Sequence, residues 1–306
     1  MRRIVACFFA LVFLFCGCAA PKAQGKIKIV ATVFSAYDFA RAVAGGDAEV
    51  SMLLSPGTEI HSFEPTAEDI IAIENADIFI YTGGDSDVWV DRILGSIDIS
   101  NKKIIRMVDK AKTLIYEEHA DHGHTDHNHS DSPDEHVWLS PDNAKSIISA
   151  ICRELCAVDS KNSAAYKERA ESYCRDITLL DGETRDTIAA AKYKTLVVAD
   201  RFPLKYLCAH YGLEAVAAFD ACDHFVDADA KTVLKLIETV NQEKLSFVFY
   251  LENGSGYLAD TVCRETGAEK IVINSMHTIS REDFGLGITY IDIMRQNKEA
   301  LERGLN

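Results

Sequence analysis

The sequence lacks the short motifs that mark several large classes of enzymes. It contains no H-E-x-x-H motif, no G-x-S-x-G nucleophile elbow and no glycine-rich phosphate loop. It has nine cysteines but no C-x-x-C pair. Because the usual catalytic signatures are missing, we expect that the chain is not an enzyme.

The chain is also short of positive charge. Its 32 Lys and Arg residues are outnumbered by 47 Asp and Glu residues, for a net charge of −15. Phosphates would be repelled by such a chain, so nucleic acid is not an expected partner. The same excess of acids attracts cations weakly over the whole surface.

Long hydrophobic runs are missing after the first residues. The start, MRR followed by IVACFFALVFLF, reads as a signal peptide over 1–18 and is too short to span a bilayer comfortably. Phe15-Cys16-Gly17-Cys18 resembles a bacterial lipobox, which predicts a lipid on Cys18 and a flexible tether over 19–25. An ordinary secretory signal cut nearby is the alternative. The lipid would be the only membrane anchor, on the extracytoplasmic side.

Six cysteines remain once Cys7, Cys16 and Cys18 are set aside. An even number outside the cytoplasm permits disulfides, but six cysteines allow 15 full pairings, and the sequence does not choose among them. The six are Cys152, Cys156, Cys174, Cys208, Cys222 and Cys263. Cys152 and Cys156 lie four apart on an expected helix, where we favour core positions over a bridge.

Apolar runs that alternate with helical patterns predict an α/β fold with parallel sheets. We expect an N-terminal α/β lobe over 26–140, linking helices over 141–192 and a C-terminal α/β lobe over 193–306. The lobes are expected to be Rossmann-like and bridged by one long rigid helix. The predicted strands are 26–33, 48–54, 77–83, 102–108, 194–199, 213–219, 245–251 and 269–275.

Helix boundaries are marked by capping residues. Ser35 is expected to cap a helix that ends at Gly45, and Thr66 with Asp69 forms a capping-box pattern. Ser140 followed by Pro141 predicts another helix start. Residues 162–191 contain no proline and predict a helix of roughly 45 Å at 1.5 Å per residue.

Several polar side chains directly follow predicted strands. Ligands of open parallel sheets bind beyond the carboxyl ends of the strands, so these residues are expected to share one crevice. Each has an ordinary structural reading as well, such as a capped turn or a surface histidine. The residues are His61, Asp200, Glu252, Asn274 and His277, with His136 just before the Ser140 helix.

Residues 117–135 form a loop rich in histidine and acid. His122-Gly-His124-Thr-Asp126-His127 fits the H-x-H-x-D-H run of metallo-hydrolases, but its flanks are too polar to bury and organise a catalytic metal. We favour a mobile collector that binds zinc weakly and passes it to the crevice, and a dispensable solvated loop is the alternative. Its histidines are His119, His122, His124, His127 and His129.

Five stretches, in this order, resemble the metal-binding lipoprotein family of bacterial ABC importers for zinc and manganese. They are GTEIHSFEPTAEDI (57–70), ADIFIYTGGDSDVWVDRI (76–93), DEHVWLSPDNA (134–144), YLCAHYGL (206–213) and YIDIMRQNKEAL (290–301). The His-acid loop before 134–144 is typical of the zinc-binding members. The resemblance implies two α/β lobes, a long bridging helix and one divalent ion held between the lobes.

The resemblance assigns His61 and His136 to the first two metal ligands of the family. At the third and fourth positions this chain has Arg201 and Asn274 instead of the usual ligands. We therefore predict a site of His61, His136 and His277, with Asp200 as a provisional fourth ligand. Three imidazoles with one carboxylate or water favour zinc over manganese.

The function that the resemblance implies is capture and delivery of Zn²⁺. The expected partners are an ABC permease and its ATPase subunit, and the chain is expected to act as a monomer. The same fold carrying manganese or iron is the main alternative. A metallohydrolase or an adhesin is a further one.

Overall fold

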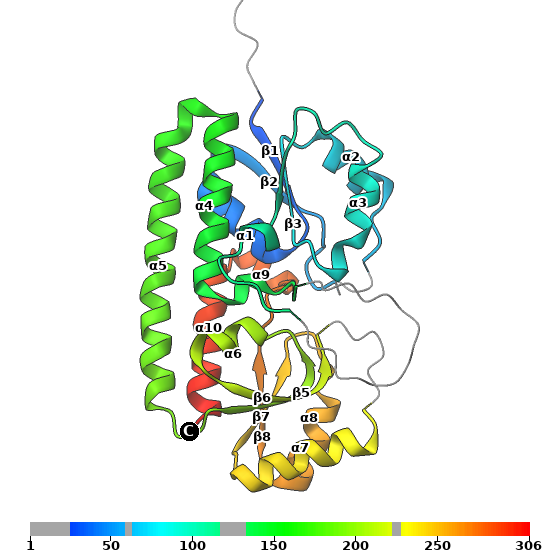
Figure 1. Cartoon of the computed structure of the whole chain (residues 1–306), viewed down its shortest axis with the longest axis vertical. Helices are drawn as coiled ribbons and strands as arrows, with labels where there is room; N and C mark the ends of the chain where they lie inside the picture. The colour runs from blue at the N-terminus through cyan, green and yellow to red at the C-terminus, as the bar shows by residue number, and fades with distance from the viewer. Residues whose placement is uncertain (1–24, 59–62, 117–132, 222–227) are drawn as a thin grey trace, which may run out of the picture.

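The computed structural model describes residues 25–58, 63–116, 133–221 and 228–306. Within these residues the chain folds into two α/β lobes that lie one above the other (Figure 1). The predicted signal peptide, Cys18, His61 and the histidines of the loop 117–135 lie outside the described residues. None of the described helices has the length and apolar character that crossing a membrane requires.

The N-terminal lobe is built on a four-stranded parallel sheet. Its strand order is β2-β1-β3-β4. All four residues of β3 are buried, as expected for a strand covered by helices on both faces. The strands are β1 (Ile27–Ala31), β2 (Ala48–Met52), β3 (Ile78–Tyr81) and β4 (Lys103–Arg106).

The C-terminal lobe repeats the same plan. Its strand order is β6-β5-β7-β8, again with every pair parallel. The strands are β5 (Thr195–Phe202), β6 (Glu214–Asp220), β7 (Phe247–Leu251) and β8 (Glu269–Ile273). All eight strands predicted from hydrophobic runs are therefore confirmed, with ends shifted by a few residues. In each sheet the first strand along the chain lies between the second and the third, so the connections leave it in opposite directions. At such a point a ligand crevice is expected beyond the carboxyl ends of the strands.

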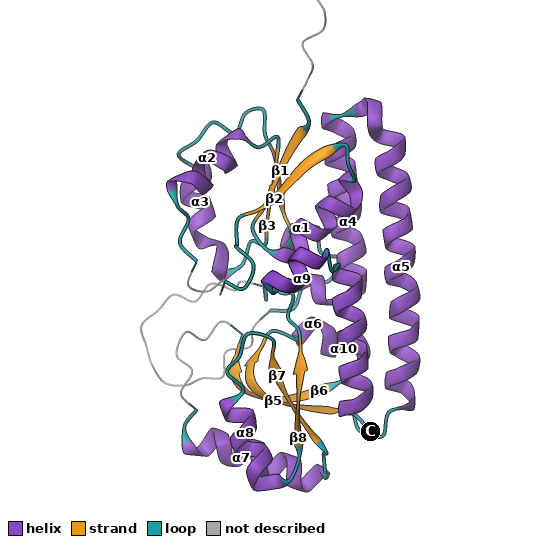
Figure 2. Cartoon of the chain, turned by 180° about the vertical axis from the view of Figure 1, so that it is seen from behind, coloured by secondary structure: helices purple, strands orange, loops and turns teal. Residues whose placement is uncertain are grey.

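Helices cover both faces of each sheet (Figure 2). In the N-terminal lobe these are α1 (Phe34–Ala44), α2 (Ala67–Asn75) and α3 (Val88–Leu94). In the C-terminal lobe they are α6 (Lys205–Tyr211), α7 (Ala230–Glu243) and α8 (Tyr257–Thr266). The remaining helices are α4 (Pro141–Val158), α5 (Ser163–Ala190), α9 (Arg281–Leu286) and α10 (Tyr290–Gly304).

The helix α5 bridges the two lobes, as predicted. It has 28 residues, which corresponds to about 42 Å. It runs along one side of the molecule beside both sheets (Figure 1), and packs on α1 and α4 above and on α10 below. Its buried positions follow helical spacing, which places one stripe of the helix against the lobes: Tyr166, Ala170, Ile177, Leu180, Thr184 and Ile188.

One hydrophobic core runs through both lobes. It extends from Ile29 in β1 through Trp138 and α4 to Leu305 at the end of the chain. Two smaller clusters lie on the outer sides, one beneath α2 and α3 and the other beneath α7 and α8. Because the largest cluster is shared, the lobes are joined by packed side chains as well as by the chain itself.

Capping residues explain most helix starts. Thr66 and Asp69 form the predicted capping box, and Ser140 caps α4 with Pro141 at its first position. The prediction for Ser35 is wrong, because α1 begins at Phe34 with Val33 as its N-cap. The amide of Phe34, the first residue of α1, donates to the carbonyl of His277 at 2.9 Å, so the other lobe satisfies one of the N–H groups at the start of this helix. The predicted end at Gly45 is confirmed.

The described cysteines are free thiols: Cys152, Cys156, Cys174, Cys208 and Cys263. Cys152 is part of the main core and Cys156 packs against it, which confirms the core interpretation of this pair. Burial, the largest cause, raises the pKa of the Cys152 thiol to about 11, and the neighbouring Cys156 adds to the effect.

Candidate metal centre

His136 lies at the end of the N-terminal lobe, just before the helices that link the two lobes. A short 3-10 turn, Val137–Leu139, follows it and leads through Ser140 into α4. The carboxylate of Asp134 accepts from the backbone N–H and from Nδ1 of His136, each at 2.9 Å. This carboxylate therefore holds the ring in the tautomer that carries its proton on Nδ1.

The second nitrogen of His136 is buried and makes no hydrogen bond to any described residue. A buried polar atom normally has a partner. In the tautomer selected by Asp134, Nε2 presents a lone pair, which is the form of imidazole that binds a metal ion. His136 therefore has the orientation and the burial that a metal ligand would need.

Glu135 is the second member of the centre and was not predicted as a ligand. Its Oε2 accepts from the backbone N–H of Ser86 at 3.1 Å and from the Ser86 hydroxyl at 2.7 Å. Its Oε1 lies 3.6 Å from Nε2 of His277. Gly84 makes room for this side chain, because a Cβ at that position would lie 2.3 Å from both Cβ and Oε2 of Glu135.

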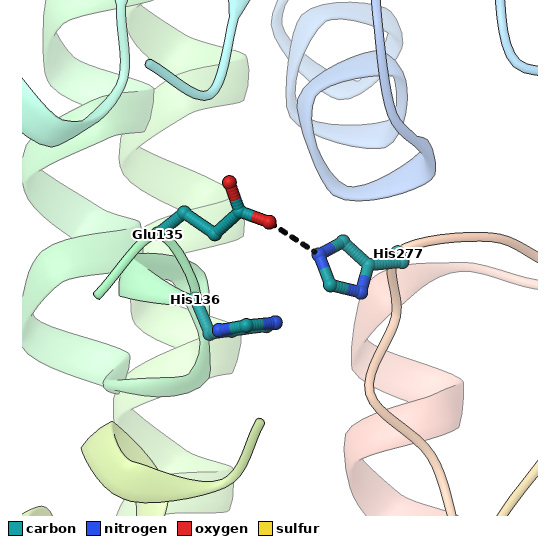
Figure 3. A group of neighbouring side chains, drawn as sticks. All are labelled: Glu135, His136 and His277. Atoms are coloured by element: carbon teal, nitrogen blue, oxygen red, sulfur yellow. Dashed lines mark ion pairs between the residues drawn. The ribbon is translucent and has the colours of Figure 1, made fainter. Parts of the chain in front are cut away.

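His277 reaches the centre from the C-terminal lobe, on the loop that follows β8. Its ring centroid lies 4.5 Å from that of His136 and 5.0 Å from that of Trp138. Figure 3 shows Glu135 and His136 on one side and His277 opposite them, with the Glu135–His277 ion pair between. The prediction placed His136 and His277 in one crevice, and the structure brings them together.

Glu135, His136 and His277 each offer one ligand atom, and these atoms lie within 4.8 Å of one another. All three residues are buried. Two imidazole nitrogens and one carboxylate oxygen form a donor set that suits zinc, which prefers nitrogen with few ligands. A fourth position is left for another side chain or a water.

Charges around the centre favour an ionised carboxylate. Burial raises the pKa of Glu135, but the neighbouring His277 and the charge of His136 outweigh burial and lower the pKa to about 2. Burial likewise opposes protonation of His136, but Asp134 and Glu135 outweigh it and raise the pKa of His136 above 6.5. The centre thus has a strong affinity for positive charge, which a divalent cation can satisfy in place of protons.

Asp87 adds a further buried acid behind Glu135. Burial, followed by the charge of Glu135, raises the pKa of Asp87 to about 7. Its Oδ2 accepts from the amides of Thr82 and Gly83 at 2.6 and 3.1 Å. Asp87 therefore fixes the loop after β3, which in turn carries Ser86 against Glu135.

A small cavity of about 30 Å³ opens beside the two histidines. Its walls include Thr58 from the N-terminal lobe and Arg201 and Glu252 from the C-terminal lobe. Thr58 is three residues before His61. Thr58 is the last described residue before the range 59–62.

Asp200 and Asn274 are not among the converging ligand atoms. Asp200 accepts from the amides of Arg201 and Leu251 at 2.9 and 3.3 Å and lines an adjoining cavity of about 650 Å³ at the ends of β5 and β7. Asn274 uses its Oδ1 to accept from the amide of Met276 at 2.7 Å. His61 and the loop histidines lie outside the described residues, so their place in the site stays a prediction.

Sequence reasoning missed Glu135 although it directly precedes His136. The available signal was the acid pair Asp134-Glu135 before the histidine. A carboxylate next to a ligand in sequence is often only its hydrogen-bond partner, and that role belongs to Asp134 here. The contact with Ser86 that turns Glu135 inward spans 49 positions and is not visible in the local pattern.

These features define a two-lobed α/β protein with a buried candidate metal centre where the lobes meet. The chain belongs to the family described as zinc-uptake complex component A, periplasmic, which matches it over residues 29–304. This is a family of transport components, in agreement with the expectation that the chain is not an enzyme.

Named relatives support the assignment. The zinc-binding lipoprotein AdcA of Streptococcus pneumoniae is 31% identical over 307 residues, which cover 99% of this chain and 61% of AdcA. The chain thus spans about three fifths of that relative. The high-affinity zinc uptake system protein ZnuA of Bacillus subtilis is 29% identical, with 99% of this chain and 96% of ZnuA covered.

A solved structure shares the fold. The Zn(II)-bound ZnuA-like domain of Streptococcus pneumoniae AdcA superposes with a TM-score of 0.76 at 29% identity. The match covers 92% of this chain and 99% of that domain. The predicted fold class, two parallel-sheet lobes bridged by a long helix, is confirmed.

Proposed function

We propose that this protein captures one zinc ion between its lobes outside the cytoplasm and delivers it to an ABC importer. The observation that carries the proposal is the buried group of Glu135, His136 and His277, with ligand atoms from both lobes within 4.8 Å. The named relatives are zinc-binding or zinc-uptake proteins, which supports zinc as the cargo.

The ligand set that we propose is His136, His277 and Glu135, completed by the predicted ligand His61. In this arrangement His136 is held by Asp134 and Glu135 by Ser86 before the ion arrives. Zinc exchanges bound water for imidazole nitrogen, which requires both histidines to be neutral. Asp200, the provisional fourth ligand of the sequence prediction, is then replaced by Glu135.

The permease and its ATPase subunit are proposed as partners because the family is a component of an uptake complex. Residues 1–18 are proposed to direct export, and a lipid on Cys18 is proposed to keep the protein at the membrane. The histidines of residues 117–135 are proposed to collect zinc weakly and to pass it to the centre. None of these steps requires chemistry on the cargo other than ligand exchange.

Zinc binding by the metal-free protein tests the proposal. Competition with a chromophoric chelator is expected to show one tight zinc site per chain, and the variant carrying both His61→Ala and His136→Ala is expected to lose it. Tight one-to-one binding by that double variant would show that the ion is held elsewhere. Glu135→Ala and Asp200→Ala, measured in parallel, decide which carboxylate is the ligand.

Cobalt distinguishes zinc from the manganese and iron alternative. A site with imidazole nitrogens and few ligands is expected to give the intense visible absorption of tetrahedral Co²⁺. An octahedral, oxygen-rich site gives weak absorption instead. A weak spectrum together with tighter manganese than zinc binding would move the proposal to manganese.

A further inference from the structure

His277 is held by a segment without regular secondary structure. Residues Asn274–Ser280 lie between β8 and α9, and the backbone of this segment contacts both lobes. His277 accepts from the amide of Phe34 at 2.9 Å, and Ile279 accepts from that of Gly57 at 2.8 Å. The position of the His277 ring therefore depends on the particular contacts of this segment.

Glu252 supports this segment through both oxygens of its carboxylate. It follows β7, and its Oε2 accepts from the amide of Ser275 at 2.9 Å while its Oε1 accepts from the Ser275 hydroxyl at 2.7 Å. The carbonyl of Ser275 accepts from the indole of Trp138 at 2.8 Å. Ser275 is thus clamped between a carboxylate of one lobe and an aromatic side chain next to His136.

A second support comes from α10. Asn297 is buried, and its side chain accepts from the amide of Asn274 and donates to the carbonyl of Asn274, both at 2.8 Å. This pair does not touch the metal centre. Asn297 thereby holds Asn274, the first residue of the segment. Oδ1 of Asn274 in turn accepts a hydrogen bond from the amide of Met276 at 2.7 Å.

These supports hold an uncommon backbone conformation. Met276 has a φ of 58° and is completely buried, and Lys244 is the other non-glycine residue with positive φ in the described part of the chain. A left-handed conformation at a bulky residue is strained and persists only where its surroundings enforce it. The turn at Met276 directly precedes His277, so it determines the direction of that side chain.

We infer that Glu252 is a positioning residue for zinc: by clamping Ser275 it enforces the strained turn that aims His277 at His136. This inference rests on the proposed function, in which His277 is a zinc ligand. Glu252 lines the same cavity as the two histidines. Its two oxygens, however, contact Ser275, so its effect on the ion is transmitted through the loop.

Two substitutions test the inference from opposite sides of the loop. Glu252→Ala removes both acceptors of Ser275, and Asn297→Ala releases Asn274 from α10 without touching the cavity. Both are expected to weaken zinc binding by about 10- to 100-fold, as for other groups that orient ligands. Glu252→Gln retains one carbonyl acceptor and is expected to fall between wild type and Glu252→Ala. Glu243→Ala, an exposed glutamate at the end of α7, is the matched control.

The cobalt absorption spectrum separates positioning from general damage. A displaced His277 is expected to shift the visible Co²⁺ bands in both variants, while circular dichroism of the metal-free proteins stays unchanged. Wild-type affinity and an unshifted spectrum in Glu252→Ala would overturn the inference. So would complete loss of binding in Glu252→Ala with an unaffected Asn297→Ala, because Glu252 would then be a direct ligand.

The folding of the variants does not limit the test. If Glu252→Ala fails to fold, the Glu252→Gln and Asn297→Ala variants decide the matter by the same two measurements. Absence of tight zinc binding in the wild-type protein would instead contradict the proposed function itself, so the two failures are distinguishable.

Discussion

The two histidines of the metal centre are supported in different ways. His136 is oriented by Asp134, two positions away in the sequence, and it leads directly into the capped helix α4. His277 is oriented by residues from several distant segments, among them Glu252, Asn297 and Phe34. One proposed ligand is thus oriented by local contacts, and the other is oriented by the tertiary structure.

This difference indicates which ligand responds to changes elsewhere in the molecule. A local support breaks only when the neighbouring residue changes. A tertiary support also depends on packing elsewhere in the molecule, and the hydrogen bond from the Phe34 amide to the His277 carbonyl spans the junction between the lobes. Substitutions that disturb one histidine and not the other therefore separate the local support of His136 from the tertiary support of His277.

The largest expected effect is the loss of a ligand itself. His136→Ala and His277→Ala are each expected to weaken zinc binding by more than about 100-fold, because loss of an orienting group alone costs about 10- to 100-fold. Chelator competition at fixed pH measures the change. His210→Ala is the matched control, since His210 pairs with Asp181 of α5 and lies outside the centre. Equal losses in all three variants would contradict the assignment.

The local support is tested at Asp134. Asp134→Ala frees the ring of His136 and is expected to weaken zinc binding by about 10- to 100-fold. Asp134→Asn retains an acceptor for Nδ1–H and is expected to lose less. Asp98→Ala removes an exposed carboxylate and is expected to have no effect. An unchanged affinity in Asp134→Ala would show that the ring is held without this bond.

Glu135 is tested through the residue that makes room for it. Gly84→Ala places a methyl group 2.3 Å from the Glu135 side chain, so we expect a loss of about 1–3 kcal/mol of folding stability together with weaker zinc binding. Thermal unfolding and zinc titration measure the two effects. Gly46→Ala is the control, because a methyl group there has no atom within 4 Å. Wild-type zinc affinity in Gly84→Ala would argue against Glu135 as a ligand.

The pH dependence of binding follows from the raised pKa of His136. Zinc requires the neutral ring, so protons compete with the ion below the pKa of the folded state. Since that pKa is above 6.5, affinity is expected to begin falling at a higher pH than for an exposed histidine. Titrations between about pH 5.5 and 8 are expected to show about a tenfold loss per unit for each competing proton. In Asp134→Ala the fall is expected to start at lower pH.

The smallest effect is expected far from both histidines. Gly182 lies exposed within α5, with no atom within 4 Å of the place where a methyl group would be added. Gly182→Ala is expected to stabilise the protein by about 0.5–1 kcal/mol, because glycine is unfavourable in a helix. Zinc affinity is expected to stay at the wild-type value, and a clear change in it would show that α5 is coupled to the centre.

Much of the fold could be read from local pattern. The eight strands are short apolar runs, and the start of α4 at Ser140-Pro141 and the length of α5 follow from residues close together in the sequence. Ser35 failed as a cap because α1 begins earlier, at Phe34 with Val33 as its N-cap, so Ser35 lies inside the helix. The local pattern placed this helix start two residues too late.

In the candidate site, too, local pattern predicted some residues and distant contacts decided the others. His136 and His277 were identified because each lies in a loop beside a strand or helix end, on the crevice that parallel sheets predict. Glu135 was missed because Ser86, 49 positions away, turns it inward. Asp200 follows β5 as expected, but hydrogen bonds to backbone amides hold its carboxylate at another cavity.

The sequence by itself determined the two parallel sheets, the bridging helix and the histidines available for a metal ion, because periodicity, caps and strand ends are local properties. Only the tertiary structure decided which of these side chains meet. Glu135, His136 and His277 converge because packing between the lobes brings loops more than 100 positions apart into contact. The interactions that orient them, from Ser86 and Glu252, join residues distant in the sequence within one lobe and exist only once that lobe has folded.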